Sequence, residues 1–145
     1  MTDVPTIHAS AVLVGAKAAL IRGPSGAGKS LLAWRLLQSA LPFTRLVGDD
    51  RVHVAAVGDR LLVRPAPALT GLIEMRSLGI RRLFCEELAV VGFVVDLSAP
   101  VPARLPEAGS VAEIAGVTLP RLAIAGGTDP LHIVLAFLGS SASGG

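Results

Sequence analysis

Cysteine is nearly absent from this chain of 145 residues. Its one cysteine, Cys85, has no second thiol in the sequence with which to form a disulfide. Chains without internal disulfides are typical of reducing compartments. The first ten residues, MTDVPTIHAS, lack the basic and apolar segments of a secretory signal. We therefore expect a cytoplasmic protein in which Cys85 is a small core or interface residue.

Aromatic and lysine side chains are also scarce. Aromatic residues make up 3% of the chain and tyrosine is absent, so platforms for stacking bases are not expected. Lys17 and Lys29 are the only lysines, and the arginines are scattered apart from RSLGIRR at 76–82. Without a basic stripe, nucleic-acid binding is disfavoured. No apolar run reaches the ~18 residues that a membrane helix needs, so no membrane partner is expected.

What the chain does contain is apolar residues, 52% of the total, arranged in short runs. The longest run, 88–95, suits a buried strand, because strands covered on both faces are apolar throughout. The runs 7–14 and 17–22, separated by two residues, predict a hairpin. Good helix formers over 29–40 predict a largely buried helix that Pro42 ends. These runs predict an α/β fold with a buried parallel or mixed sheet.

The sequence GPSGAGKS at 23–30 has the G-x-x-x-x-G-K-S spacing of a phosphate-binding loop. It lies between a predicted strand and a predicted helix, which is the context this motif requires. A helix N-terminus attracts anions because its first N–H groups lack partners and its dipole is positive there. Lys29 is expected to reach the β- and γ-phosphates, and the Ser30 hydroxyl to ligate Mg²⁺. The predicted nucleotide-binding residues are Gly23, Pro24, Ser25, Gly26, Ala27, Gly28, Lys29 and Ser30.

A pair of carboxylates follows the predicted helix. In FTRLVGDDRVHV at 43–54, Asp49 and Asp50 stand at the end of a predicted strand. Nucleotide-binding α/β sheets carry their ligand-binding groups at that edge. An Asp-Asp pair is also a common turn, and without its context that interpretation would be favoured. Beside a phosphate-binding loop, we expect one carboxylate to hold Mg²⁺ and the other to take a proton from a substrate hydroxyl.

Two further groups are ambiguous on their own. Glu74 and Arg76, in GLIEMRSLGI at 71–80, form either a surface ion pair or a metal carboxylate with a phosphate-directed arginine. A lone histidine in an apolar strand, such as His8, is more often a satisfied core residue than a functional one. A role for His8 therefore needs other support.

Taken in order, these segments resemble the catalytic domain of the HPr kinase/phosphorylase family. Its members phosphorylate a serine of HPr, a phosphocarrier of the sugar phosphotransferase system. The phosphate-binding loop is generic, whereas E-x-R-x-x-G-I after D-D-R-V is specific to this family. The resemblance extends from His8 to about Arg121. It rests on HASAV at 8–12, GPSGAGKS at 23–30, LVGDDRV at 46–52, GLIEMRSLGI at 71–80 and ARLP at 103–106.

The resemblance implies a mixed-sheet P-loop nucleotide-binding domain of the HPr kinase and phosphoenolpyruvate carboxykinase type. The family's N-terminal domain has no counterpart in this sequence. We expect one catalytic domain over 1–139 and a flexible Gly/Ser tail over 140–145. The resemblance also implies a homo-hexamer, Mg²⁺ as cofactor, and ATP and HPr or an HPr-like phosphocarrier as partners.

The resemblance also implies roles for individual residues. His8 matches the family's active-site histidine, and Lys29 matches the lysine of its phosphate-binding loop. Asp50 matches the general base towards the substrate serine, and Arg104 matches a catalytic arginine. The expected metal ligands are Ser30, Asp49 and Glu74, of which Ser30 and Glu74 match those of the family.

One residue and one segment depart from the family pattern. Ser77 stands where the family usually has glycine. The segment 122–134, LAIAGGTDPLHIV, has neither the arginine nor the asparagine that the family ties to phosphorolysis of the phosphoserine. The sequence therefore predicts an ATP-dependent serine protein kinase with little or no phosphorylase activity. The alternatives are a small-molecule kinase and a nucleotide-binding regulatory module without catalysis.

Overall fold

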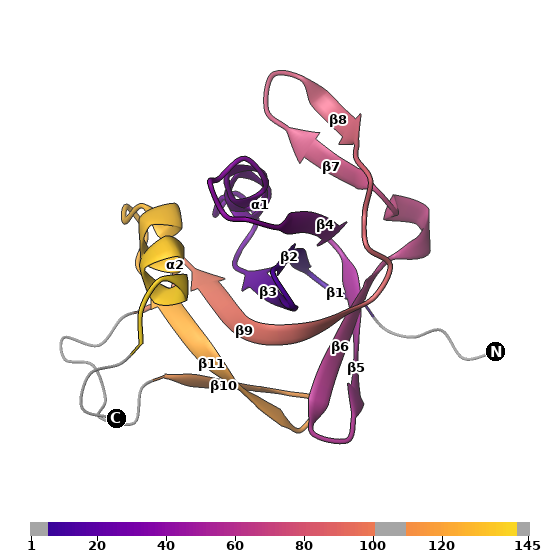
Figure 1. Ribbon diagram of the computed structural model, residues 1–145. Coiled ribbons are helices and arrows are strands. Elements are labelled where there is room, and N and C mark those ends of the chain that lie inside the picture. The colour runs from indigo at the N-terminus through magenta and orange to yellow at the C-terminus, as the bar shows by residue number, and fades with distance from the viewer. Residues whose placement is uncertain (1–5, 101–109, 142–145) are drawn as a thin grey trace.

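The computed structural model of this protein describes residues 6–100 and 110–141 (Figure 1). Arg104 therefore lies outside the described residues. The helices are α1 (Lys29–Leu37), α2 (Pro130–Leu138) and a short 3₁₀ helix at Pro67–Leu69. The strands are β1 (Thr6–Ile7), β2 (Ala9–Val14), β3 (Lys17–Arg22), β4 (Thr44–Gly48), β5 (Val52–Val57), β6 (Arg60–Pro65), β7 (Leu72–Met75), β8 (Gly79–Arg82), β9 (Ala89–Leu97), β10 (Val111–Ile114) and β11 (Val117–Ile124).

Nine strands form one curved sheet (Figure 1). Seven of them follow one another in the order β1-β5-β6-β9-β3-β2-β4. The β10–β11 pair joins this sheet through β11, which pairs with β9. The long strand β9 is parallel to β3 and β11 but antiparallel to β6, so the sheet is mixed. The expected mixed-sheet α/β fold is confirmed. The apolar run 88–95 forms most of β9, which is the central strand that these three neighbours share.

The predicted N-terminal hairpin is confirmed, because β2 and β3 pair antiparallel up to Val14 and Lys17. Its first strand is shorter than the predicted run 7–14. Ile7 belongs to β1 and pairs with Val52 of β5, whereas β2 pairs with β3 and β4. The chain changes strand partners at His8, so this residue lies in a break between two strands.

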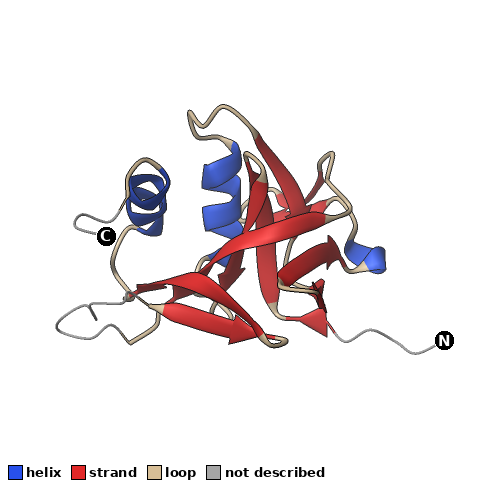
Figure 2. Ribbon diagram, turned by 60° about the horizontal axis from the view of Figure 1, so that its bottom comes forward, coloured by secondary structure: helices blue, strands red, loops and turns tan. Residues whose placement is uncertain are grey.

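Apolar side chains fill both faces of the sheet, as the alternation along β3 illustrates. Leu20 belongs to a cluster with Leu61 of β6, and here the curved sheet folds over its own face. The next residue, Ile21, points to the opposite face, where Leu36 of α1 and Val134 of α2 pack. Both helices therefore cover the same face of the sheet (Figure 2). This packing sets the direction in which the N-terminus of α1 points.

Helix α1 begins where the sequence predicts but ends three residues earlier than expected, at Leu37. The hydroxyl of Ser39 donates to the carbonyl oxygen of Leu36 at 2.6 Å and satisfies an acceptor at the helix end. Leu32, Ala33 and Leu36 form the buried face. No helix in residues 6–100 or 110–141 is long and apolar enough to cross a membrane.

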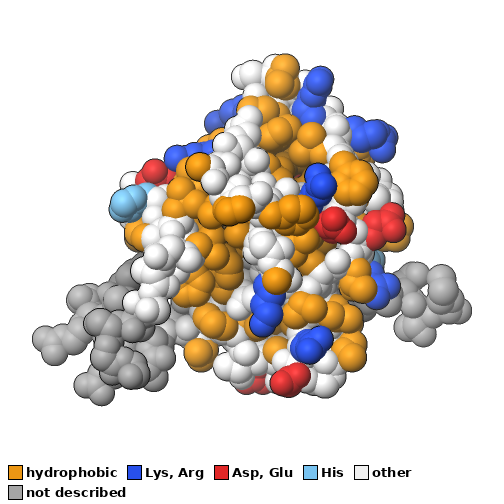
Figure 3. Space-filling view, viewed as in Figure 1, with side chains coloured by type: hydrophobic (Ala, Val, Ile, Leu, Met, Phe, Trp, Pro, Cys, Tyr) orange, Lys and Arg blue, Asp and Glu red, His pale blue; other side chains and the backbone are white. Residues whose placement is uncertain are grey.

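The strands β7 and β8 form a separate two-stranded sheet that projects beyond α1 at the top of Figure 1. Ile73 anchors this hairpin, since it is 1% exposed and packs in the same cluster as α1. In contrast, every residue of β8 is exposed. Leu78 and Ile80 are 62% and 69% exposed, and Figure 3 shows hydrophobic side chains beside basic ones in this region. The hairpin is thus fixed at its base and open at its tip.

Candidate active site

The predicted phosphate-binding loop connects the end of β3 to the start of α1. Gly26 and Gly28 have φ angles of 83° and 98°, which residues with a side chain rarely adopt. A Cβ atom at either position would meet nothing within 4 Å, so the loop borders open space. Gly28 is the N-cap of α1, and no side chain of the described residues caps this helix end. Its first N–H groups are therefore available to an anion.

The side chain of Lys29 folds back over the loop. Its ammonium group donates to the carbonyl oxygens of Gly23 and Pro24 at 2.9 and 3.2 Å. The residue is 7% exposed, so these two bonds satisfy much of the need of a nearly buried cation for acceptors. They also hold the amine beside the loop that is predicted to bind phosphate.

Asp49 follows β4 directly and is 4% exposed. The hydroxyl of Ser30, at the start of α1, lies 2.8 Å from each of its carboxylate oxygens. A second hydroxyl, that of Ser10 in β2, donates to Oδ1 at 2.6 Å. The backbone N–H of Glu74 lies 3.3 Å from Oδ2. Three segments of the chain thus converge on one buried carboxylate.

Asp50 points in a different direction from its neighbour. Its backbone φ is 69°, a left-handed conformation that aspartate tolerates better than most residues, and its side chain is 63% exposed. One carboxylate oxygen lies 2.8 Å from Nε2 of His8, whose side chain is 39% exposed. The two predicted acids therefore occupy distinct environments: Asp49 is enclosed behind Ser30, and Asp50 is open to solvent beside a histidine.

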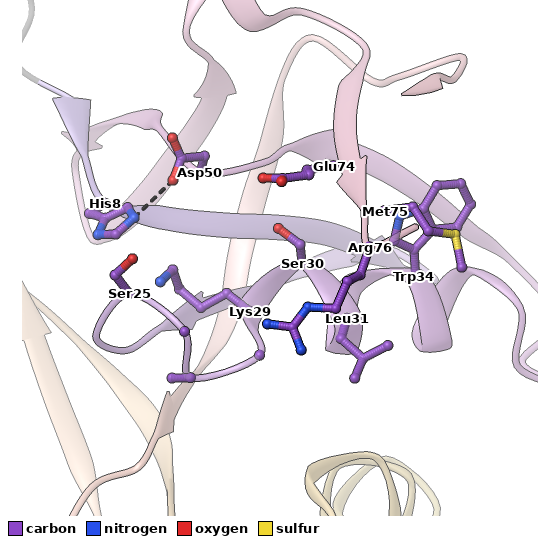
Figure 4. Close-up of a pocket in the computed structure, with 13 residues that line it drawn as sticks. His8, Ser25, Lys29, Ser30, Leu31, Trp34, Asp50, Glu74, Met75 and Arg76 are labelled. Carbon is purple, nitrogen blue, oxygen red and sulfur yellow. Dashed lines mark hydrogen bonds and ion pairs between the residues drawn. The ribbon is translucent and has the colours of Figure 1, made fainter. Parts of the chain in front are cut away.

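The β7–β8 hairpin closes the site from the other side. Glu74 and Met75 at the end of β7, and Arg76 in the turn that follows, border the same cleft as the loop. In Figure 4, the side chains of Lys29, Ser30 and Glu74 face a common space. The cleft has a volume of about 610 Å³. Its lining comprises His8, Ser25, Gly26, Ala27, Gly28, Lys29, Ser30, Leu31, Trp34, Asp50, Glu74, Met75 and Arg76.

The three expected metal ligands supply oxygen atoms of the kind that Mg²⁺ prefers. Ser30 and Glu74 border the cleft, and Asp49 lies directly behind the Ser30 hydroxyl. Among the described residues, no group of three or more His, Cys, Asp or Glu could hold a metal ion by itself. Mg²⁺ at a nucleotide site usually takes one or two carboxylates together with phosphate oxygens and waters. The residues therefore fit a Mg²⁺ ion that arrives with a nucleotide.

The segment 122–134 does not border the cleft. Its carboxylate, Asp129, accepts the N–H of Leu131 at 3.1 Å as the N-cap of α2 and pairs with Arg35 of α1 at 2.7 Å. The hydrogen bond from Arg35 lowers the pKa of the Asp129 carboxyl. Asp129 thus tethers α2 to α1, a structural role that its turn-like sequence TDP did not reveal.

An ion triplet supports the base of the loop. Asp96, near the end of β9, accepts hydrogen bonds from Arg22 of β3 at 2.7 and 2.8 Å and from Arg121 of β11. Burial alone would raise the pKa of the Asp96 carboxyl. The hydrogen bonds and charges of the two arginines together outweigh burial and lower this pKa. The triplet ties three adjacent strands together immediately before Gly23.

Four residues of this region have no predicted role in the sequence: Ser10, Leu31, Trp34 and Met75. Ser10 was passed over as part of the apolar run ASAVLV, although it is the only hydroxyl within that strand. Trp34 lies in the predicted helix 29–40 and also borders the cleft. Cys85 lies outside the cleft, and burial raises the pKa of its thiol, so it stays protonated and is a weak nucleophile.

Comparison with known proteins points to the same family as the sequence resemblance. A family model described as HPr Serine kinase C-terminal domain matches residues 1–125. A protein of Limosilactobacillus reuteri named HPr kinase/phosphorylase is 31% identical over 131 residues, which cover 82% of this chain and 40% of the relative. A protein of the same name from Exiguobacterium sp. is 38% identical over 81 residues, covering 55% of this chain and 25% of the relative. The chain thus spans less than half the length of these curated relatives.

A solved structure has the same fold. It is described as the Hpr(Ser) kinase/phosphatase from Coxiella burnetii and superposes with a TM-score of 0.76. The match covers 93% of this chain and 95% of the other, with 21% sequence identity. At this identity the likeness concerns the fold alone.

Proposed function

Because this chain belongs to the HPr serine kinase C-terminal domain family, we propose that it is an ATP-dependent protein kinase. The proposed reaction transfers the γ-phosphoryl group of ATP to a serine hydroxyl of HPr or an HPr-like phosphocarrier. One structural observation supports this proposal independently of the family. A buried acid bonded to the loop serine, Asp49, and an exposed acid bonded to a histidine, Asp50, stand side by side at one cleft. This pair provides separate groups for metal binding and for proton transfer.

In this proposal, residues Gly23–Ser30 hold the phosphates of ATP. The uncapped N-terminus of α1 supplies N–H donors, and the glycines allow the backbone to approach the phosphates closely. Lys29 exchanges its bonds to the carbonyl oxygens of Gly23 and Pro24 for bonds to phosphate oxygens. That exchange replaces two neutral acceptors with anionic ones, which bind an ammonium more strongly.

Ser30, Asp49 and Glu74 are the proposed ligands of Mg²⁺. When bound, Mg²⁺ neutralises charge on the transferring phosphoryl group. The protein's own contribution is orientation, since Asp49 is held by hydrogen bonds from β2, α1 and β7 before any ligand arrives. A preorganised acceptor of this kind needs little rearrangement when a ligand binds.

Asp50 is the proposed general base. Its carboxylate takes the proton of the substrate serine as the serine oxygen bonds to the γ-phosphorus. The bond between the γ-phosphorus and its bridging oxygen breaks, and ADP leaves. His8 fixes the Asp50 carboxylate through its 2.8 Å hydrogen bond. The 63% exposure of the Asp50 side chain suits a protein substrate, which must reach the base from outside. We further propose, on the family resemblance, that Arg104 adds positive charge to the transition state.

The experiment that tests this function uses ATP labelled at the γ-phosphate, Mg²⁺ and purified HPr. We expect labelled phosphoserine on HPr. Label on a small molecule from a metabolite mixture, with none on HPr, would favour the small-molecule kinase instead. Nucleotide binding without any transfer would favour the regulatory module and overturn the proposed activity.

We propose that the reverse reaction, phosphorolysis of phosphoserine-HPr by inorganic phosphate, is weak. Phosphorolysis needs a second anion held in line with the phosphoserine, and arginine or amide side chains usually provide that contact. The segment 122–134 has neither, and Asp129 within it is engaged with Arg35. Phosphoserine-HPr with millimolar phosphate should therefore release pyrophosphate much more slowly than the forward reaction consumes ATP. Comparable rates in the two directions would refute this part of the proposal.

We also propose that residues 1–139 act as one catalytic unit and that six copies assemble, as the family resemblance implies. Light scattering coupled to size-exclusion chromatography measures the mass directly. A hexamer of 14.8 kDa chains is the expected result, and a monomer that transfers phosphate would show that assembly is unnecessary.

A further inference from the structure

Ser10 is a buried polar residue in an otherwise apolar strand. Its relative exposure is 0%, and its neighbours Ala9 and Ala11 are equally enclosed. A buried hydroxyl without a partner would destabilise the fold, so its hydrogen bonds indicate why it is tolerated. The Ser10 hydroxyl donates its one proton to Oδ1 of Asp49 at 2.6 Å. It thereby contacts the proposed metal ligand from behind.

The same hydroxyl also contacts the second acid. A serine oxygen that has donated its proton can still accept, and the backbone N–H of Asp50 lies 3.4 Å from it. The N–H of Ala9, the residue before Ser10, donates to the carbonyl oxygen of Asp50 at 3.1 Å. Strand β2 therefore holds both the carboxylate of Asp49 and the left-handed backbone of Asp50.

Ser10 and Ser30 share Oδ1 of Asp49 but differ in access to the cleft. Ser30 borders the cleft and can turn its oxygen towards a ligand, whereas Ser10 does not border it. Contact with a metal or phosphate would draw the Ser30 hydroxyl away from Asp49. The Ser10 bond would remain, because no ligand in the cleft can reach it.

We infer that Ser10 is a positioning residue for the metal site, orienting Asp49 while Ser30 engages the ligand. The inference rests on the proposed function, because it assumes that Ser30 and Asp49 hold Mg²⁺. Partners of metal-binding carboxylates typically change metal affinity by 10- to 100-fold when they are removed. Loss of the Ser10 hydroxyl should therefore weaken metal binding without removing any ligand.

The test measures Mn²⁺ binding by electron paramagnetic resonance, with a non-transferable ATP analogue present. Ser10→Ala should weaken Mn²⁺ affinity by about 10- to 100-fold relative to the wild-type chain. Affinity for the analogue in the presence of a chelator should stay unchanged, since the hydrogen bonds of the Ser10 hydroxyl go to Asp49 and Asp50 rather than to the phosphate-binding loop. The matched control is Ser39→Ala, which removes a hydroxyl bonded to Leu36 away from the acids. This control should bind Mn²⁺ as the wild type does.

Several outcomes decide the inference. Wild-type Mn²⁺ affinity in folded Ser10→Ala, with only a lower melting temperature, would make Ser10 purely structural and overturn it. If Ser10→Ala does not fold, Ser10→Cys replaces it, because a thiol has similar shape but is a weak donor. Weaker Mn²⁺ binding by Ser10→Cys supports the inference, and wild-type affinity overturns it.

The same experiment separates this inference from the proposed function. A wild-type chain that binds Mn²⁺ with the analogue but phosphorylates no HPr would refute the kinase and leave the role of Ser10 intact. A wild-type chain that binds no Mn²⁺ would overturn both.

Discussion

The cleft has two walls that differ in how firmly they are built. The sheet wall, formed by β2, β4 and the start of α1, carries Ser10, Lys29 and Asp49, each less than 8% exposed. The hairpin wall, formed by β7 and β8, carries Glu74 and Arg76, and all of β8 is exposed. The hydrogen bond from the Glu74 N–H to Asp49 joins the two walls, and Ile73 anchors the hairpin in the core. The contrast shows that Lys29 and Asp49 are held by the core, whereas Glu74 and Arg76 stand on an exposed extension.

The largest effect should come from removing the cation of the sheet wall. Lys29→Ala should abolish phosphoryl transfer, a loss of more than about 10³-fold, and weaken ATP binding, because it deletes the charge nearest the phosphates. Calorimetry of nucleotide binding and a label-transfer assay measure the two effects. Lys17→Ala is the matched control, since Lys17 is the only other lysine and lies at the start of β3, outside the cleft. Unchanged affinity and turnover in Lys29→Ala would remove the nucleotide site from this loop.

Substitutions of the two acids of the sheet wall, Asp49 and Asp50, should have different effects. Asp50→Asn should keep ATP binding but lower transfer by about 10²-fold or more, the usual scale for a general base. Asp49→Asn should instead weaken metal-dependent nucleotide binding. Asp59→Asn, in the turn between β5 and β6, makes the same change outside the cleft and should be neutral. Near-normal transfer by Asp50→Asn beside an inactive Asp49→Asn would mean that the roles are reversed.

The ion triplet beneath the sheet wall should stabilise the fold in a pH-dependent way. Asp96→Asn should lower the free energy of unfolding at neutral pH by about 2 kcal/mol, because it removes charged hydrogen bonds to Arg22 and Arg121. The pKa of Asp96 is lowered in the folded state, so its contribution is present above the ordinary value of 3.8. That contribution is lost as the pH falls below 3.8 through the folded pKa.

Urea titrations of both proteins over this pH range measure the difference. The gap between wild type and Asp96→Asn should shrink as the solution becomes more acidic. Glu86→Gln breaks an exposed contact with Arg45 at 3.9 Å and should have little effect at any pH. A gap that stays constant down to pH 2 would show that the triplet's charge is irrelevant to stability.

The smallest effect concerns the hairpin wall. Ser77 has a φ of 77°, which strains a residue with a side chain by about 1–2 kcal/mol. Ser77→Gly should relieve this strain. Glycine also raises the conformational entropy of the unfolded chain, which lowers the free energy of unfolding by about 0.4–1 kcal/mol. The net gain should lie between about 0 and 1.6 kcal/mol, seen as a slightly higher melting temperature.

Ala56→Gly provides the opposite case at an exposed position in β5, where φ is not positive. It should destabilise the protein, because only the entropic term remains. A loss of stability in Ser77→Gly as well would show that the turn of the hairpin is not strained.

Local patterns predicted much of the sheet wall. The loop, the start of α1 and the acids after β4 follow from motifs and runs of adjacent residues, and the structure has the corresponding elements at these places. The mixed sheet came from the family resemblance and from the apolar run of β9, whose neighbours β3, β6 and β11 are distant in sequence. The assignment of catalytic roles stays a prediction.

The features that sequence could not supply depend on long-range pairing. Strand β2 aligns Ala11 with Gly48 of β4, which brings Ser10 next to Asp49. Nothing near Ser10 in the chain specifies that alignment. The divergent directions of Asp49 and Asp50 depend on one left-handed backbone angle, which the letters D-D do not encode. Likewise, the break at His8 arises because β1 and β2 pair with different strands.

Trp34 gives the cleft a built-in optical reporter. It is the only tryptophan of a chain without tyrosine, so ultraviolet emission excited at long wavelength comes from one ring. That ring borders the cleft, as does Met75 of the hairpin (Figure 4), and its indole N–H is buried without a partner among the described residues. Emission from such a ring responds to changes in its immediate surroundings. Events in the cleft can therefore be followed by the light that the unlabelled protein emits.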